Sequence, residues 1–289
     1  MLFFGFVLPS FICVGDRLIA PFREAVQFFL PSLATGGGGS WDAVGSLPDS
    51  DPHGGVAQVR NLYIRVFGRG VDEGSLFSIE SPVAQYDSAS SQFVGTDFVH
   101  VRGNLFTALG NRWIFFGGER RLVLDSAVQA FLEIDGGAES EDILTEGGRT
   151  VVGGQSLQID VKEGAIFLRF RQDVSLRSGG FLLCSDELVV EIAREEPMRI
   201  LDQEFAGEAI RSVRAAGAVR VEWPARSATA DSAQIFPGEG VIFLSGNVNV
   251  LERESQIRCQ GLLFRSDQCH TVAEEGICLE QVLQFLNFN

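Results

Sequence analysis

The chain has 289 residues, of which 45% are apolar and 21% charged, so it can bury a substantial core in one large or two modest domains and is not a disordered chain. Its formal net charge of −15 argues against nucleic-acid binding, because a phosphate backbone needs a basic protein face. Its 33 glycines and 24 phenylalanines, beside only 9 prolines, favour short strands and tight turns.

The N-terminal region combines apolar runs with a Gly- and Ser-rich stretch. Residues 2–15 are almost wholly apolar, and after Asp16-Arg17 this character resumes through residues 18–34. The first run is shorter than the roughly 20 residues of a membrane-spanning helix, and no basic residue precedes Arg17 as in a secretory signal. A buried helix is the alternative. We predict a hydrophobic signal or membrane anchor at 1–35, whose cleavage stays open, and a flexible linker at 36–55.

From Val56 onward, short runs alternate apolar and polar residues and are broken by Gly, Asp, Asn and Ser. This pattern is typical of β-strands joined by turns. An acidic stretch at 136–148 divides the runs into two groups, 56–140 and 141–268. The final residues, 269–289, carry apolar side chains at roughly helical spacing, so we expect a tail that caps an open end of the stack as a short C-terminal helix or a strand.

One phrase of the sequence occurs twice at an offset of 76 residues. Gln158-Ile159, Glu163-Gly164 and Ile166-Phe167-Leu168 return as Gln234-Ile235, Glu239-Gly240 and Ile242-Phe243-Leu244. Repetition on this scale indicates stacked supersecondary units, because a single unit cannot bury its own apolar face. We therefore expect the function to lie on a long, repeated β surface.

The five cysteines show no Cys-x-x-Cys spacing, which argues against a zinc or thioredoxin-like site. Cys184 and Cys259 occupy nearly corresponding points of the two repeat copies, one residue away from the 76-residue offset, and we predict that they fill the core. Cys269 and Cys278 are close enough along the chain to close a loop in an oxidising compartment. Whether they form a disulfide stays open.

Alternation within the strands places one set of apolar side chains on a common face. This set is Ile166, Leu168, Val174, Val219, Val221, Ile242, Leu244, Val248 and Val250. The set either fills a packed core or lines an apolar trough for acyl chains, in which each buried CH₂ contributes about 0.8 kcal/mol. Arg169, Arg171 and Arg220 lie in the same strands, and they either meet headgroup phosphates at the rim of the trough or belong to a solvated face.

Three strand patterns between residues 208 and 265 carry a resemblance. They are Ala215-x-Gly217-x-Val219, Ala228-x-Ala230-Asp231-x-Ala233 and Ile242-x-Leu244-x-Gly246-Asn247-Val248. In these patterns the chain resembles the OstA-like family of lipopolysaccharide-transport proteins, which contains the periplasmic protein LptA and the membrane-anchored protein LptC. The likeness extends more loosely over residues 70–268, and residues 75–135 look more like LptC. We therefore expect LptC-like β repeats at 56–140 and an OstA/LptA-like β-jellyroll at 141–268.

The resemblance implies an all-β fold, an open β-jellyroll or half-pipe of stacked antiparallel strands. It also implies a periplasmic protein that is tethered to the inner membrane by its N-terminal segment and binds lipopolysaccharide or a related glycolipid. The lipid would pass to other β-jellyroll proteins that join by edge-strand pairing, and an inner-membrane ABC-type extractor would supply the energy. The trough and rim residues would then be the lipid-binding and headgroup residues.

The sequence offers little for catalysis. It contains no His-Glu-x-x-His, Gly-x-Ser-x-Gly or P-loop pattern, and His53, His100 and His270 are scattered. We therefore expect a protein that is not an enzyme and needs neither cofactor nor metal. The alternative to lipid transfer is a non-catalytic β-solenoid scaffold that self-assembles end to end, with a filled interior and no bound lipid.

Overall fold

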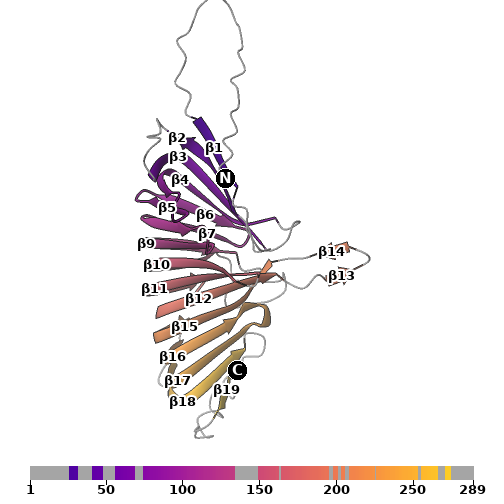
Figure 1. Ribbon diagram of the computed structural model, residues 1–289. Helices are drawn as coiled ribbons and strands as arrows, with labels where there is room; N and C mark the ends of the chain where they lie inside the picture. The colour runs from indigo at the N-terminus through magenta and orange to yellow at the C-terminus, as the bar shows by residue number, and fades with distance from the viewer. Residues whose placement is uncertain are drawn as a thin grey trace, which may run out of the picture.

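The computed structural model shows an all-β protein, as the sequence predicts (Figure 1). The structure describes residues 26–31, 41–47, 56–68, 74–133, 149–162, 164–194, 198–200, 203–205, 208–224, 226–252, 255–265 and 271–274. No helix among these residues has the length and apolarity needed to cross a membrane. The predicted hydrophobic segment up to residue 25 and the predicted C-terminal helix after residue 274 lie outside the described residues.

The strands pair antiparallel, almost entirely in chain order, and form one long stack (Figure 1). Their bounds are β1 Val26–Pro31, β2 Trp41–Leu47, β3 Val56–Phe67, β4 Ser75–Asp87, β5 Gln92–Gly95, β6 Val99–Gly103, β7 Phe106–Gly110, β8 Trp113–Phe116, β9 Arg121–Leu132, β10 Thr150–Lys162, β11 Ala165–Ser178, β12 Phe181–Arg194, β13 Met198–Ile200, β14 Gln203–Phe205, β15 Glu208–Trp223, β16 Arg226–Phe236, β17 Val241–Glu252, β18 Ser255–Arg265 and β19 Thr271–Glu274. Strand β4 pairs with both β5 and β6, and β9 pairs with both β7 and β8, so these four short strands replace two long ones. Strands β13 and β14 form a separate hairpin that projects from the stack.

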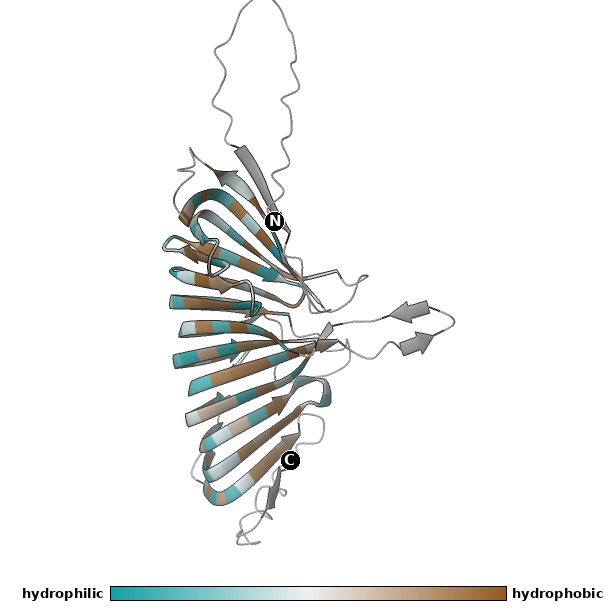
Figure 2. Ribbon diagram, in the orientation of Figure 1, coloured by the Kyte–Doolittle hydropathy of each residue, from teal (hydrophilic) through white to brown (hydrophobic). Residues whose placement is uncertain are grey.

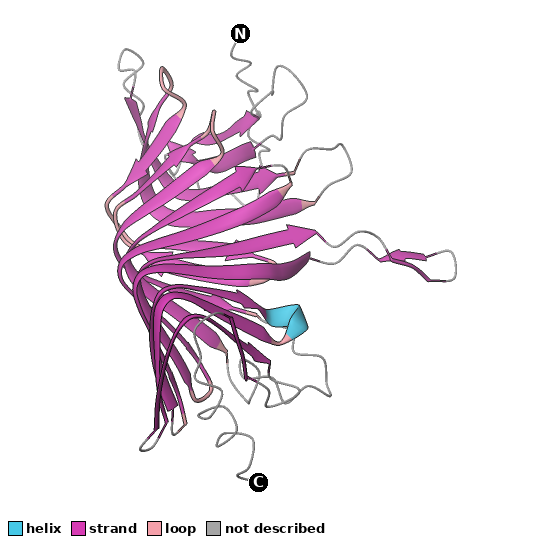
Figure 3. Ribbon diagram, turned by 90° about the horizontal axis from the view of Figure 1, so that it is seen from below, coloured by secondary structure: helices cyan, strands magenta, loops and turns pink. Residues whose placement is uncertain are grey.

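The long strands bend together along one line, so the sheet folds into two walls (Figure 3). The pairing register shifts at this line, which we call the crease. The shifts lie at Gly154/Ser156 in β10, Arg171/Val174 in β11, Cys184/Glu187 in β12, Ala216/Val219 in β15, Thr229/Ser232 in β16 and Ser245/Val248 in β17. We call the side that contains residues 156–162 wall A and the side that contains residues 150–153 wall B. Each long strand therefore contributes one half to each wall.

The crease is visible in the spacing of buried residues. Away from it, buried and exposed side chains alternate with a period of two, and apolar and polar positions alternate accordingly along the ribbons in Figure 2. At the crease, the step between successive buried residues lengthens from two to three on three of the long strands. These steps are Ser81 to Ala84 in β4, Ser185 to Leu188 in β12 and Ala230 to Ala233 in β16. The one-residue slip keeps the apolar side chains of both walls on the inner face of the fold.

The repeated phrase forms two equivalent hairpins, β10–β11 and β16–β17. Gly164 and Gly240 occupy the turns, with φ of +83° and +59°, a conformation that glycine adopts without steric cost. The hairpins differ in register, because Ile159 pairs with Leu168 whereas Ile235 pairs with Ile242. The difference of two residues leaves every side chain on its original face, since strand periodicity is two.

Part of the predicted anchor and linker is sheet. Residues 26–31 form β1, which pairs with β2, and β2 lies within the predicted linker. The flanking Gly and Ser residues suggested a tether, but Trp41 and Ala43 alternate inward and are buried, which holds β2 against β3. At the other end, residues 271–274 of the predicted capping tail form strand β19 against β18, which is the strand alternative for this part of the tail.

Candidate functional site

The interior between the two walls is the candidate site. All nine predicted trough residues lie there, and each is at most 3% exposed. They belong to one continuous cluster of apolar side chains that includes residues from β2 through β18. Alternation in the sequence therefore predicts correctly which side chains face inward. Whether the interior accepts lipid is a separate question, which depends on whether the two walls can separate.

In this structure the walls are closed over the interior. Less than a tenth of the surface of each buried side chain in the cluster is exposed to solvent, which is the burial of an ordinary protein core. The two walls are connected at the crease, where the long strands run from one wall into the other. No backbone pairing among the described residues links their free edges. Along the opposite side, which we call the mouth, side chains alone hold the walls together.

One set of aromatic rings crosses the mouth in the N-terminal half, and we call it clasp 1. Trp41 extends from wall B at the start of β2, and its indole meets Phe93 of β5 and Phe115 of β8 in wall A. The ring centroids are 5.8 and 5.9 Å apart, with edge-on angles of 89° and 87°. Such aromatic pairs contribute about 0.5–1.5 kcal/mol each beyond the area they bury. Gly117 makes room for this contact, because a Cβ atom there would lie 2.7 Å from the indole nitrogen of Trp41.

A second set, clasp 2, crosses the mouth in the C-terminal half. Trp223 ends β15 in wall B, and its ring lies 5.0 Å from Phe264 of β18 in wall A and 5.8 Å from Phe181 of β12. The indole nitrogen of Trp223 is buried without a hydrogen-bond partner among the described residues. A buried donor without a partner costs about 1–3 kcal/mol, so clasp 2 closes the mouth less favourably than its contact area suggests.

At the crease, two carboxylates occupy the space above two glycines. Gly246 of β17 has a φ of +73°, and a Cβ atom there would collide with Oδ2 of Asp231 on β16. Asn247 also has a left-handed φ, and its Nδ2 donates to Oδ2 of Asp231 at 2.8 Å. Gly217 and Asp186 repeat this arrangement between β15 and β12. The Ala-Asp-x-Ala and Gly-Asn-Val patterns of the resemblance are thus the residues that bend the sheet.

The three predicted rim arginines lie on the outer faces of the walls. Nε of Arg169 is 3.1 Å and Nε of Arg171 is 3.9 Å from Glu187 of the neighbouring strand β12. Arg220 forms an ion pair with Glu222 on its own strand. These arginines alternate with buried residues and face away from the interior, and each already has a carboxylate partner. Sequence reasoning missed the clasps, because Trp41 stands in a Gly- and Ser-rich region and cross-wall contacts leave no local pattern.

The described cysteine and histidine side chains lie on both faces of the sheet. Cys259 is buried in the core as predicted, whereas Cys184 is half-buried on the outer face, so the core prediction was wrong for it. The one-residue difference in their repeat positions places them on opposite faces. His100 lies on the outer face of β6 beside Arg102. Across the described strands, no three His, Cys, Asp or Glu side chains converge on a metal-sized site.

Comparison of the chain with models of known protein families gives no match, and comparison with curated protein sequences gives no significant match either.

Proposed function

We propose that the protein binds the acyl chains of lipopolysaccharide or a related glycolipid between its two walls and passes the lipid to a neighbouring half-pipe. The observation that carries this proposal is the construction of the mouth. Two continuous apolar faces meet there, and no backbone pairing among the described residues joins their free edges. Opening the mouth therefore breaks aromatic and aliphatic contacts while the hydrogen-bonded ladders stay intact.

The energetics of opening favour exchange with lipid. Separating the walls exposes apolar surface at about 25 cal/mol per Å², and acyl chains that enter cover that surface again. Each buried CH₂ contributes about 0.8 kcal/mol, so several acyl chains offset the loss of contact between the walls. No covalent step is needed. An ATP-driven extractor in the inner membrane, as the resemblance implies, would supply lipid and set the direction of transfer.

The two ends of the stack provide surfaces for neighbours. Among the described strands, β1 pairs with β2 at one end of the ladder, and β19 pairs with β18 at the other end. The side of β19 that faces away from β18 has no paired residues among the described strands. An unpaired edge accepts a strand from another chain through main-chain hydrogen bonds. This arrangement supports edge-strand pairing with other β-jellyroll proteins. We propose, as the resemblance implies, that such a bridge runs between inner and outer membrane, with this chain in the periplasm and tethered by its N-terminal segment.

Photocrosslinking tests this proposal on matched positions. Leu244 and Val250 face the interior, and their neighbours Phe243 and Asn249 face outward on the same strand. A photoreactive residue placed at each position in cells should capture glycolipid at 244 and 250 and little at 243 and 249. Mass spectrometry of lipids that co-purify from the native envelope identifies the ligand. Equal capture at all four positions, or none at 244 and 250, would end the proposal.

The packed interior favours a second candidate, the end-to-end scaffold. A core whose buried apolar side chains are at most 9% exposed needs no ligand to be complete. A scaffold of this kind would form filaments through the two ends of the stack and purify without lipid. Electron microscopy of the purified protein, together with the lipid analysis above, separates the two functions: filaments without lipid favour the scaffold.

A further inference from the structure

A groove of about 440 Å³ lies on the outer face of wall B, away from the interior. It follows β10, between β9 and β11. Gly153 forms its floor between Ser175 of β11 and Gln129 of β9, with which it is paired in the ladder. Because Gly153 has no side chain, the side chains of its partners on the two neighbouring strands project beyond β10 and leave a hollow between them. Val151 continues the floor, and Arg177 pairs with it from β11.

The groove is lined by polar groups that no other described residue engages. The guanidinium groups of Arg149 and Arg177 have no ion pair or hydrogen bond with another described residue. Several arginines elsewhere on the sheet pair with a carboxylate, as Arg65, Arg169 and Arg226 do, whereas the exposed Arg60 and Arg258 form no ion pair with another described residue. Arg149 and Arg177 differ in that both line the same hollow, and neither has a carboxylate partner among the described residues. They place positive charge at one point of a chain whose formal net charge is −15.

The walls of the groove add donors to this charge. The Ser175 hydroxyl and the Gln129 amide line it, and neither is hydrogen-bonded to another described residue. The Thr150 hydroxyl beneath the groove donates to Oγ of Ser178 at 2.8 Å, so this proton is not available to a ligand. Guanidinium groups bind phosphate oxygens through two parallel N–H donors, and a hydroxyl and an amide supply further donors at neutral charge. The volume exceeds that of a phosphate ion and leaves room for an attached sugar-sized group.

We propose that this groove binds the phosphate group of a phosphorylated sugar, with Arg149 and Arg177 as its cationic ligands and Gln129 and Ser175 as additional donors. The sugar phosphate is either part of a glycolipid headgroup or a soluble molecule. The site is on the outer face and does not depend on acyl chains entering the interior. It therefore stands or falls separately from the lipid-transfer proposal.

Titration calorimetry with glucose 1-phosphate on the full chain tests the site. Arg149→Gln and Arg177→Gln should each weaken binding about tenfold, because each removes charge-assisted hydrogen bonds to the phosphate. Arg177→Lys should recover part of the affinity, since lysine keeps the charge without the planar fork. Arg60→Gln, at an exposed arginine outside the groove, is the matched control and should bind as the parent chain does.

A second variant addresses shape instead of charge. Gly153→Val fills the floor, and the glycine has room for a side chain, because the heavy atom nearest to an added Cβ would be Oγ of Ser175 at 3.5 Å. It should abolish binding while far-UV circular dichroism stays unchanged. Co-flotation with phosphatidylcholine vesicles that do or do not contain lipid A distinguishes a headgroup from a soluble ligand. Absence of glucose 1-phosphate binding, together with no lipid A-dependent flotation, would overturn the assignment, as would binding that the double arginine variant leaves intact.

Discussion

The indole of Trp41 meets the ring of Phe93 edge-on at a centroid distance of 5.8 Å, although the two residues belong to opposite walls of the sheet. Trp41 is on β2, which pairs with the wall B half of β3, and Phe93 is on β5, which pairs with the wall A end of β4. Trp41 and Phe93 are not on paired strands, so no backbone hydrogen bonds between their strands hold this contact in place. The N-terminal end of the mouth is therefore closed by side chains, which can separate without disturbing the ladders.

Replacing Trp41 should destabilise the fold by a measurable amount. Trp41→Ala removes a buried ring and leaves a cavity beside Phe93 and Phe115, so we expect a loss of about 3–5 kcal/mol in the free energy of unfolding. Trp41→Phe keeps an aromatic ring and should lose less than half of that. Urea unfolding followed by circular dichroism measures both. Equal losses for the two variants would show that ring contact across the mouth is not what Trp41 provides.

The crease glycines should tolerate no side chain. Gly246→Ala places a Cβ atom on a left-handed residue and against the carboxylate of Asp231, so the free energy of unfolding should fall by about 2 kcal/mol or more. Gly238→Ala is the neutral control, because an added Cβ there would meet no heavy atom within 4 Å. Adding Asp231→Ala to Gly246→Ala should restore only a small part of the loss, because it removes the contacts with Oδ2 and Cγ but leaves the contact with the Cβ of residue 231 at 2.8 Å and the backbone strain.

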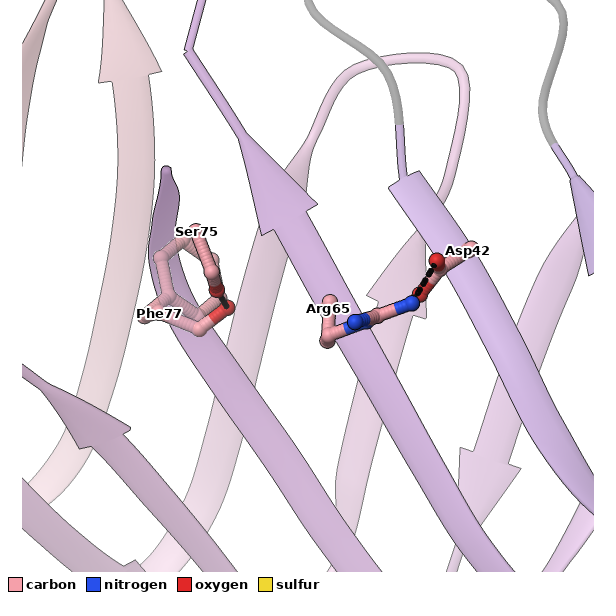
Figure 4. Close-up of polar contacts among 4 residues, drawn as sticks. All are labelled: Asp42, Arg65, Ser75 and Phe77. Atoms are coloured by element: carbon pink, nitrogen blue, oxygen red, sulfur yellow. Dashed lines mark hydrogen bonds and ion pairs between the residues drawn. The ribbon is translucent and has the colours of Figure 1, made fainter. Parts of the chain in front are cut away.

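The ion pair between Asp42 and Arg65 should contribute more than an exposed pair (Figure 4). Arg65 donates from Nε to Oδ1 at 2.9 Å and from Nη2 to Oδ2 at 2.5 Å, and this hydrogen bonding raises the pKa of Arg65. The Asp42 side chain is only 11% exposed. Asp42→Asn should lower the free energy of unfolding by about 1–2 kcal/mol. Asp125→Asn, at a pair 3.5 Å apart with both partners exposed, should change it by less than about 0.5 kcal/mol.

Stability should fall on mild acidification through His100. Burial lowers the pKa of His100 below its ordinary value, and the charge of Arg102 lowers it further, against an opposing effect of Glu80. The unfolded chain therefore binds the proton more readily, so the contribution of His100 is present above about pH 6.5 and is lost as the pH falls through the folded-state pKa. His100→Gln should remove this part of the pH dependence, and an NMR titration should place the pKa of His100 below that of a peptide histidine.

The two described cysteines should differ in reactivity. Cys184 is half-buried on the outer face, whereas Cys259 is buried in the core, where burial raises the pKa of its thiol. A thiol reagent at pH 8 should label Cys184 at least about tenfold faster than Cys259, because the thiolate is the reactive form and Cys259 requires local opening. Mass spectrometry of the labelled peptides resolves the two sites. Similar rates would show that the C-terminal strands open readily at Cys259.

Much of the fold could be predicted from local pattern. Alternation in β11, β15 and β17 identifies the inward side chains, and the Glu-Gly phrase marks two rim hairpins whose glycines take left-handed turns. The step from Ala230 to Ala233 contains the crease as well, because a three-residue interval breaks a period of two. That step in one strand does not by itself predict a crease, because the sheet folds only where the pairing register shifts at matching positions in several neighbouring strands.

The sequence by itself determined the β class, the apolar face of each strand and the residues that bend it, because these depend on side-chain alternation and backbone preference within a few residues. The tertiary structure decided how far apart the two apolar faces lie and what holds them. Trp41 and Phe93, or Trp223 and Phe264, meet only after the sheet has folded along its crease, and contacts between distant strands leave no trace in local spacing. The closed mouth, and the outer groove that Gly153 opens between its neighbours, are therefore properties of the assembled sheet.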